Sequence, residues 1–197
     1  MAAGRDTPFS CTCGQLTGTI LNLSPETGVH ARCFCADCRA AEVHLGQPDP
    51  GQDGVGLFQL SPDQVRFDRG QEHLAVMRIY PKGIMRWYAK CCGAPLFNTT
   101  SSPKVYFATM RTSRLPDPSI LGLVRVRAFV PKPGGGTRHE HAMILVRRVL
   151  SHSITALLSG QWRNTPFFDP NSRAPIRSPR ILSSDERKAA GLVRSSA

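Results

Sequence analysis

The chain has 197 residues, a formal net charge of +11 and a hydrophobic fraction of 41%. This length suits one domain with appended segments, and the hydrophobic fraction is high enough for a folded core, which excludes a wholly disordered chain. No run approaches eighteen apolar residues, so the sequence predicts no transmembrane segment. The N-terminus lacks the apolar stretch of a secretory signal, and we therefore expect a cytoplasmic protein.

The positive charge permits contact with nucleic acid or with an acidic partner. We find no aromatic RNA-binding motif and no basic helix with base-reading spacing, so nucleic acid is the less favoured partner. The 17 glycines and 16 prolines favour short strands and turns over a helical bundle. The chain is therefore expected to be mainly β.

Alternating or β-branched stretches bounded by turn residues indicate many short strands in the first two thirds of the chain. The predicted strands lie within residues 16–21, 29–33, 57–60, 65–67, 74–79, 84–89, 105–110 and 121–130. Composition then divides the chain into a disordered N-terminus (1–9), a β domain (10–130), a linker (131–138), an amphipathic helix (139–160) and an extended basic tail (161–197).

The helix is predicted because apolar residues recur every three to four positions between residues 139 and 160, where Gly160 can end it. Its broad apolar face can pack on the β domain, pair with a second copy or lie on a membrane surface. Packing on the domain or in a homodimer is the commoner arrangement for such a face.

All seven cysteines fall in three short motifs. In a reducing compartment, such grouping indicates metal binding or catalysis better than it indicates disulfides. The motifs are Cys11-Thr12-Cys13-Gly14, Cys33-Phe34-Cys35-Ala36-Asp37-Cys38-Arg39 and Cys91-Cys92-Gly93.

Cys11 and Cys13 form a C-x-C pair that can direct two thiolates at one tetrahedral zinc ion. The second half of such a site must come from elsewhere, and the available partner is Cys91-Cys92, which a glycine also follows. Zinc bound here would join distant parts of the chain and would stabilise the fold.

Cys33, Cys35 and Cys38 supply three thiolates from one loop. Three protein ligands with one open position are typical of a catalytic zinc, which can accept water or a thiol. Two alternatives remain: a structural site with a fourth ligand from elsewhere, or a group of reduced, buried cysteines.

Taken together, the motifs resemble those of the glutathione-dependent formaldehyde-activating enzyme family, a superfamily that includes centromere protein V. The resemblance rests on C-x-C-G (11–14), C-x-C-x-x-C-R (33–39) and R-x-x-x-x-C-C-G (86–93). The chain is more similar still to an uncharacterised bacterial branch, through Phe58-Gln-Leu-Ser-Pro62, the stretch 86–98 and Asn164-Thr-Pro-Phe-Phe-Asp169.

The resemblance implies a β-tent-like (Mss4-like) zinc-binding fold of antiparallel sheets, to which the C-terminal helix is added. It implies a structural zinc at the first and last cysteine motifs. It also implies a second zinc at Cys33, Cys35 and Cys38, where the glutathione adduct of formaldehyde would react. The corresponding activity is that of a carbon–sulfur lyase acting on a small thiol adduct.

Two departures from the family pattern are visible. The family ends on C-x-x-C-G, and alignment on Cys92-Gly93 places Ala89 at the first cysteine position. Cys91 can substitute, although adjacent residues rarely both reach one ion, so the fourth ligand beside Cys11, Cys13 and Cys92 stays open. Residues 108–113 also lack the acidic residue usual at the end of that strand.

Arg39 and Arg86 lie beside the cysteine motifs and are candidates to bind a carboxylate of a glutathione-like ligand. Ordinary ion pairs are the alternative. Three functions are compatible with these observations: a zinc-dependent carbon–sulfur lyase, a zinc-stabilised module that binds an acidic partner or nucleic acid, and a thiol-based redox or metal sensor.

Overall fold

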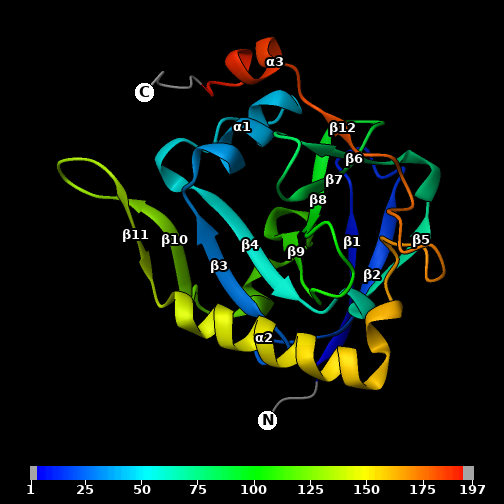
Figure 1. Ribbon diagram of the computed structural model, residues 1–197. Coiled ribbons are helices and arrows are strands. Elements are labelled where there is room, and N and C mark those ends of the chain that lie inside the picture. The colour runs from blue at the N-terminus through cyan, green and yellow to red at the C-terminus, as the bar shows by residue number, and fades with distance from the viewer. Residues whose placement is uncertain (1–3, 193–197) are drawn as a thin grey trace.

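The computed structural model describes residues 4–192, which form two β-sheets and three α-helices (Figure 1). The smaller sheet has the order β1 (Arg5–Ser10), β2 (Thr17–Leu23) and β5 (Val65–Arg69). The larger sheet has the order β11 (Thr137–Glu140), β10 (Val126–Pro131), β3 (Val29–Cys33), β4 (Val55–Leu60), β9 (Ala108–Arg111), β8 (Ala94–Thr99), β7 (Met85–Ala89), β6 (Leu74–Arg78) and β12 (Arg180–Ile181).

Neighbouring strands are antiparallel except in the pairs β10–β3 and β12–β6. The α-helices are α1 (Ala36–His44), α2 (Ala142–Ser159) and α3 (Ser184–Ala189). The prediction of a mainly β protein with one long helix is therefore confirmed. Short 3-10 helices lie in the connections at Gly51–Asp53, Pro62–Gln64, Gln71–His73, Thr112–Arg114, Pro118–Leu121 and Gln161–Arg163.

The main core is a cluster of aromatic side chains contributed by both sheets. Phe9 of β1 meets Phe97 of β8 edge-to-face at 5.1 Å between ring centroids. Trp87 of β7 is fully buried, and its indole N–H donates to Thr99 Oγ1 at 2.9 Å, so the polar end of the ring is satisfied. Each pair of aromatic rings in contact, such as Phe9 with Phe97, adds about 0.5–1.5 kcal/mol of stability beyond the burial of its surface. This core fixes the two sheets relative to each other.

The N-terminal segment differs from the predicted disordered lead-in over residues 1–9. Residues 1–3 lie outside the described part of the chain, but β1 begins at Arg5 and pairs with β2 along its length. Its sequence alternates, with Thr7 and Phe9 buried between exposed neighbours. This short amphipathic pattern, interrupted by Pro8, becomes a strand because Phe9 completes the core.

The predicted linker 131–138 is largely a β-hairpin. β10 extends to Pro131 and β11 starts at Thr137, so three consecutive glycines form the turn between them. The helix consequently begins at Ala142 rather than at residue 139, because His139 and Glu140 belong to β11. Figure 1 shows α2 lying across the ends of the strands.

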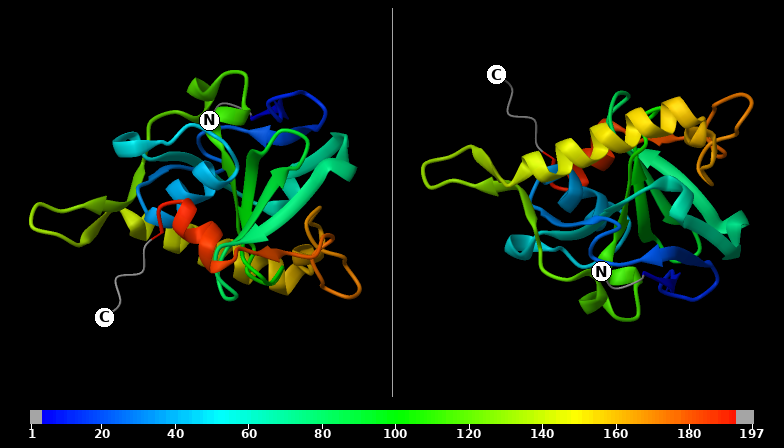
Figure 2. Two further views of the ribbon diagram at one scale, coloured as in Figure 1. Left: turned by 90° about the horizontal axis from the view of Figure 1, so that it is seen from above. Right: turned by 90° about the horizontal axis from the view of Figure 1, so that it is seen from below.

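The predicted extended tail, 161–197, is tied to the domain along the part that the structure describes. Phe167 and Phe168 enter the main core, and Trp87 packs on Phe167 at 5.1 Å. The tail then adds β12 to the edge of the larger sheet and ends in α3, close to α1. Figure 2 shows this orange and red segment running along the outside of the fold.

Candidate metal centres

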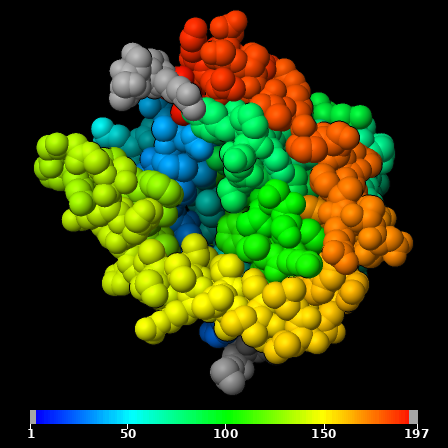
Figure 3. All heavy atoms as spheres, in the orientation of Figure 1, coloured from blue at the N-terminus to red at the C-terminus, as the bar shows by residue number. Residues whose placement is uncertain are grey.

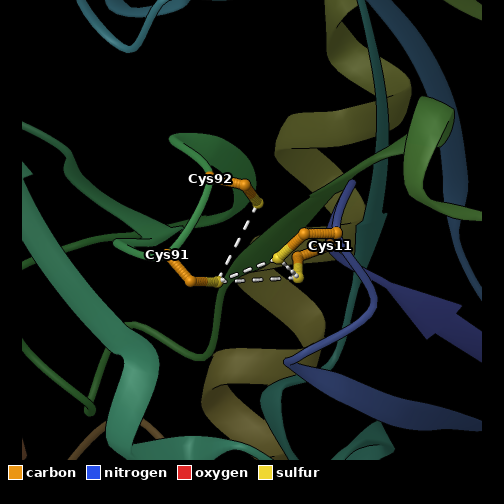
Figure 4. A group of neighbouring side chains, drawn as sticks. Cys11, Cys91 and Cys92 are labelled. Carbon is orange, nitrogen blue, oxygen red and sulfur yellow. Dashed lines mark hydrogen bonds between the residues drawn. The ribbon is translucent and has the colours of Figure 1, made fainter.

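Cys11, Cys13, Cys91 and Cys92, here called the four-cysteine cluster, come from two turns that are far apart in sequence. The first two cysteines lie between β1 and β2, and the last two between β7 and β8. Cys91 Sγ lies 3.9 Å from Cys11 Sγ and 3.4 Å from Cys13 Sγ. Figure 4 shows the sulfurs of Cys11, Cys91 and Cys92 converging from opposite loops.

The sulfur spacing matches the geometry of a tetrahedral zinc site. Four thiolates at a Zn–S distance of about 2.3 Å have sulfurs about 3.8 Å apart. The measured separations run from 3.4 to 3.9 Å, and all four sulfurs lie within 4.8 Å of one another. The four-cysteine cluster therefore fits zinc, and the sulfurs of the adjacent Cys91 and Cys92 both lie at ligand spacing. Ala89 is buried in β7 and belongs to the core instead.

Two glycines shape the turns that carry these cysteines. Gly14 has φ +74° and Gly93 has φ +68°, a left-handed conformation that favours glycine. A Cβ at Gly93 would stand 2.2 Å from the carbonyl oxygen of Leu45. The turn after Cys92 thus requires glycine at position 93 for two reasons: its left-handed backbone conformation and its close approach to the end of α1.

The thiols of Cys91 and Cys92 differ in acidity because their hydrogen bonds differ. Burial raises the pKa of Cys91 to about 12, assisted by the neighbouring Cys13 thiol. Burial acts in the same direction on Cys92, but hydrogen bonds from the Thr12 hydroxyl and from backbone N–H groups outweigh it. They lower the pKa of Cys92 to about 6. Donors already directed at this sulfur favour the thiolate that a metal requires.

Cys33, Cys35 and Cys38, here called the three-cysteine cluster, lie where β3 passes into α1. Cys33 ends the strand, Cys35 is the N-cap of the helix and Cys38 lies in its first turn. Cys33 Sγ and Cys35 Sγ are 3.4 Å apart, and the Cys38 N–H donates to Cys35 Sγ at 3.3 Å. The N-terminus of α1 favours negative charge. Contacts among the three thiols nevertheless raise the pKa of Cys33, and the pKa of Cys35 is raised to about 11, so the negative charge of the cluster lies on Cys38.

Within residues 4–192, no fourth histidine, cysteine or carboxylate joins the three-cysteine cluster at ligand spacing. Three converging sulfurs fit a metal that keeps one position for another ligand. Hydrogen bonds from the other two thiols, together with the positive charge of Arg86, hold the pKa of Cys38 well below its ordinary value. The cluster therefore combines a metal-ligand arrangement with a stabilised thiolate.

Two buried arginines stand beside the three-cysteine cluster. Arg86 Nη1 lies 3.8 Å from Cys38 Sγ, and Arg111 of β9 pairs with Glu42 of α1 at 2.7 Å. Burial raises the pKa of Glu42 and lowers that of Arg111, whereas their mutual attraction opposes both shifts. The Nε atoms of both arginines are buried with no hydrogen-bond partner in the described structure.

Sequence reasoning selected Arg86 but missed Arg111 and Glu42. Their pairing links residues 69 positions apart, which no local motif reveals. Two features of the sequence could have indicated these residues. Arg111 ends an apolar strand, Ala108–Arg111, and Glu42 follows two alanines in a short helix.

Arg39 has a different environment from Arg86. Its guanidinium makes two hydrogen bonds to Asp49, with Nε 2.7 Å from Oδ1, and its side chain is 58% exposed. Arg39 is thus engaged in an ion pair with Asp49, and its role towards a ligand stays a prediction. Both residues also line a surface cavity of about 790 Å³ bordered by Phe34 and Ala36 of the cysteine loop.

Comparison with known proteins places the chain in a family but gives no activity. No curated protein matches. A crystal structure of a Rhodobacter sphaeroides protein, solved as a Northeast Structural Genomics target, shares 20% identity over 59% of this chain and 96% of its own, with a TM-score of 0.42. Residues 3–175 match the model of DUF6151, described as a family of unknown function. The chain belongs to the DUF6151 family.

Proposed function

We propose that this protein binds two zinc ions, one structural and one open to a small-molecule thiol. The observation that carries the proposal is the contrast between the two clusters. The four-cysteine cluster supplies a complete tetrahedral ligand set, whereas the three-cysteine cluster supplies three sulfurs and, among described residues, no fourth ligand. The first set suits a structural ion and the second suits a reactive one.

When bound at the three-cysteine cluster, zinc would supply Lewis acidity that keeps a ligand thiol deprotonated near neutral pH. Residues of this chain would provide the surroundings. Arg86 and Arg111 each have an Nε–H group beside the cluster that donates to no described acceptor. Their positive charge suits an anionic substrate. Arg39 remains with Asp49 and serves the loop rather than the substrate.

The reaction that we propose is reversible addition of a thiol to a small aldehyde, a carbon–sulfur lyase activity. In the forward direction the thiol loses its proton and its sulfur forms a bond to the aldehyde carbon, while the carbon–oxygen π bond breaks and the oxygen takes up one proton. In reverse the hydroxyl loses its proton, the carbon–oxygen double bond reforms, and the sulfur leaves and regains a proton. The family resemblance of the motifs supports a β-tent-like fold and a glutathione adduct of formaldehyde as substrate. A stabilised thiolate at Cys38 and the adjacent positive charge are compatible with this chemistry.

A second proposal is a zinc-stabilised binding module without catalysis. The net charge of +11 favours it, because an acidic partner would be attracted to such a surface. Under this proposal both clusters would serve only the fold.

Metal content and exchange kinetics of matched cysteine variants separate these functions. We expect two zinc ions in the wild type and one each in Cys35→Ser and Cys91→Ser. Cys35→Ser should stay folded and lose exchange between formaldehyde and its glutathione adduct, measured by NMR. Cys91→Ser should mainly lose stability.

Wild-type protein that contains both ions but does not speed the exchange would contradict the lyase and favour the binding module. Protein that folds fully without metal would contradict both proposals.

A further inference from the structure

Helix α2 presents its apolar side to solvent. Of its 18 residues only Ala156 is buried, and Leu150 and Leu158 are 60% and 85% exposed. Figure 3 shows the helix lying on the surface as part of a continuous band with the β10–β11 hairpin. The exposed large side chains, here called the apolar face of α2, are Met143, Val146, Leu150, Ile154, Leu157 and Leu158.

Polar contacts on the opposite side of α2 fix this orientation. Ser153 Oγ accepts a hydrogen bond from the backbone N–H of Tyr106 at 3.0 Å. His152 Nδ1 lies 3.1 Å from Ser61 Oγ, in hydrogen-bond contact. Apolar contacts on this side hold the helix as well, because Ile144 and Leu145 pack on the sheet and Ala156 is buried beside Tyr106. Turning the helix to bury its exposed apolar face would break these polar and apolar contacts. A face of this kind marks an interaction surface.

The charge around α2 indicates the kind of partner. Residues 125–163 contain seven Lys and Arg side chains and one acidic side chain, so this segment carries +6 of the net charge of +11. The helix itself contains two arginines and no Asp or Glu. A second copy would bring two such positive segments together. An anionic surface would be attracted instead.

We propose that the apolar face of α2 binds the surface of an anionic phospholipid membrane, with the helix parallel to the membrane plane. Apolar side chains on one face and arginines nearby are typical of interfacial helices. By length and composition alone α2 is also able to cross a membrane, with 6% of its residues buried. Its exposed Arg147 and its contacts with the domain favour lying on the surface, whereas Arg148 turns towards the domain.

Vesicle co-sedimentation of the full-length protein tests this surface. We expect retention by phosphatidylcholine vesicles that contain phosphatidylglycerol, weaker retention by phosphatidylcholine alone, and release of the protein from the anionic vesicles at high salt. The double variant Leu150→Gln/Ile154→Gln should bind anionic vesicles at least about tenfold more weakly, since two large apolar side chains no longer leave water.

The matched control is Ile181→Gln, which replaces an exposed apolar residue of β12, distant from α2 (Figure 1). It should bind vesicles as the wild type does, and circular dichroism should show all variants folded. Absence of binding to anionic vesicles by the wild type would overturn the proposal. So would a dimer, seen by sedimentation velocity, that dissociates in the double variant while vesicles are not bound, because the second copy would then cover this face.

Discussion

Arg39 and Asp49 form an ion pair, so the pKa of the Asp49 carboxyl group reports whether Arg39 is bound to it. The hydrogen bonds from Arg39 are the main cause that lowers the pKa of Asp49 to about 2. This pair would therefore favour the folded state above about pH 4, and the contribution would fade as the pH falls towards 2. Both side chains are exposed, so we expect the effect on stability to be small.

For the variant Arg39→Gln we expect the Asp49 pKa to rise towards its ordinary value, with both metal ions retained. NMR titration of the Asp49 carboxyl and metal analysis give the two readouts. Loss of metal in Arg39→Gln would show that Arg39 supports the three-cysteine cluster after all. An unchanged Asp49 pKa would show that the pair does not form in solution.

At the scale of single residues, the sequence predicted those features of the candidate metal sites that depend on the spacing of residues within one motif. The joining of Cys11 and Cys13 to Cys91 and Cys92 followed from cysteine number and the glycines after each motif. Cys91 and Cys92 were both candidates, but the sequence left the fourth ligand open, because the position of the Cys91 sulfur depends on how the turn curls at Gly93. The Glu42–Arg111 ion pair was not predicted, because a buried pair between residues far apart in sequence leaves no periodic pattern in the sequence.

At the scale of elements, the tail beyond α2 is part of the core. We expect Phe167→Ala to destabilise the protein by about 3–5 kcal/mol, because a fully buried aromatic side chain leaves a cavity against Trp87. Chemical denaturation measures the change. Leu123→Ala, at an 88% exposed position, is the control and should change stability by less than about 0.5 kcal/mol. Equal stability of both variants would mean that the tail does not pack as described.

The elements predicted best were those with strong periodicity, namely α2 and the strands β3, β4 and β6. Strand β1 and helix α3 were missed for different physical reasons. β1 carries few apolar residues and a proline, and it becomes a strand because it pairs with β2 and buries Phe9 in the core. α3 is a six-residue helix that starts with a Ser183–Glu186 capping box, a signal that was overlooked in a basic, proline-rich tail.

At the scale of the whole molecule, the four-cysteine cluster bridges the turn after β1 and the turn before β8. Because ligands from both turns must meet, bound metal would add to the folding free energy. We expect a strong chelator to lower the melting temperature by roughly 10 °C or more, given that about 1 kcal/mol corresponds to 2–4 °C for a chain of this size.

Scanning calorimetry with and without chelator measures this difference. Cys35→Ser, which would empty only the open site, should keep most of the chelator sensitivity, and Cys91→Ser should lose it. A melting temperature that does not respond to the chelator would contradict a structural role for metal at this cluster.

The insertion of Phe167 between the sheets has a consequence for the nascent chain. The cysteines are all synthesised by residue 92, whereas the aromatic core is completed only when residues 167 and 168 emerge. At about 5–20 residues per second, ribosomal synthesis of the intervening segment takes roughly 4–15 s. During that interval the thiols lie in an incomplete fold. Metal acquired then would shield them from oxidation before the last third of the polypeptide closes the molecule.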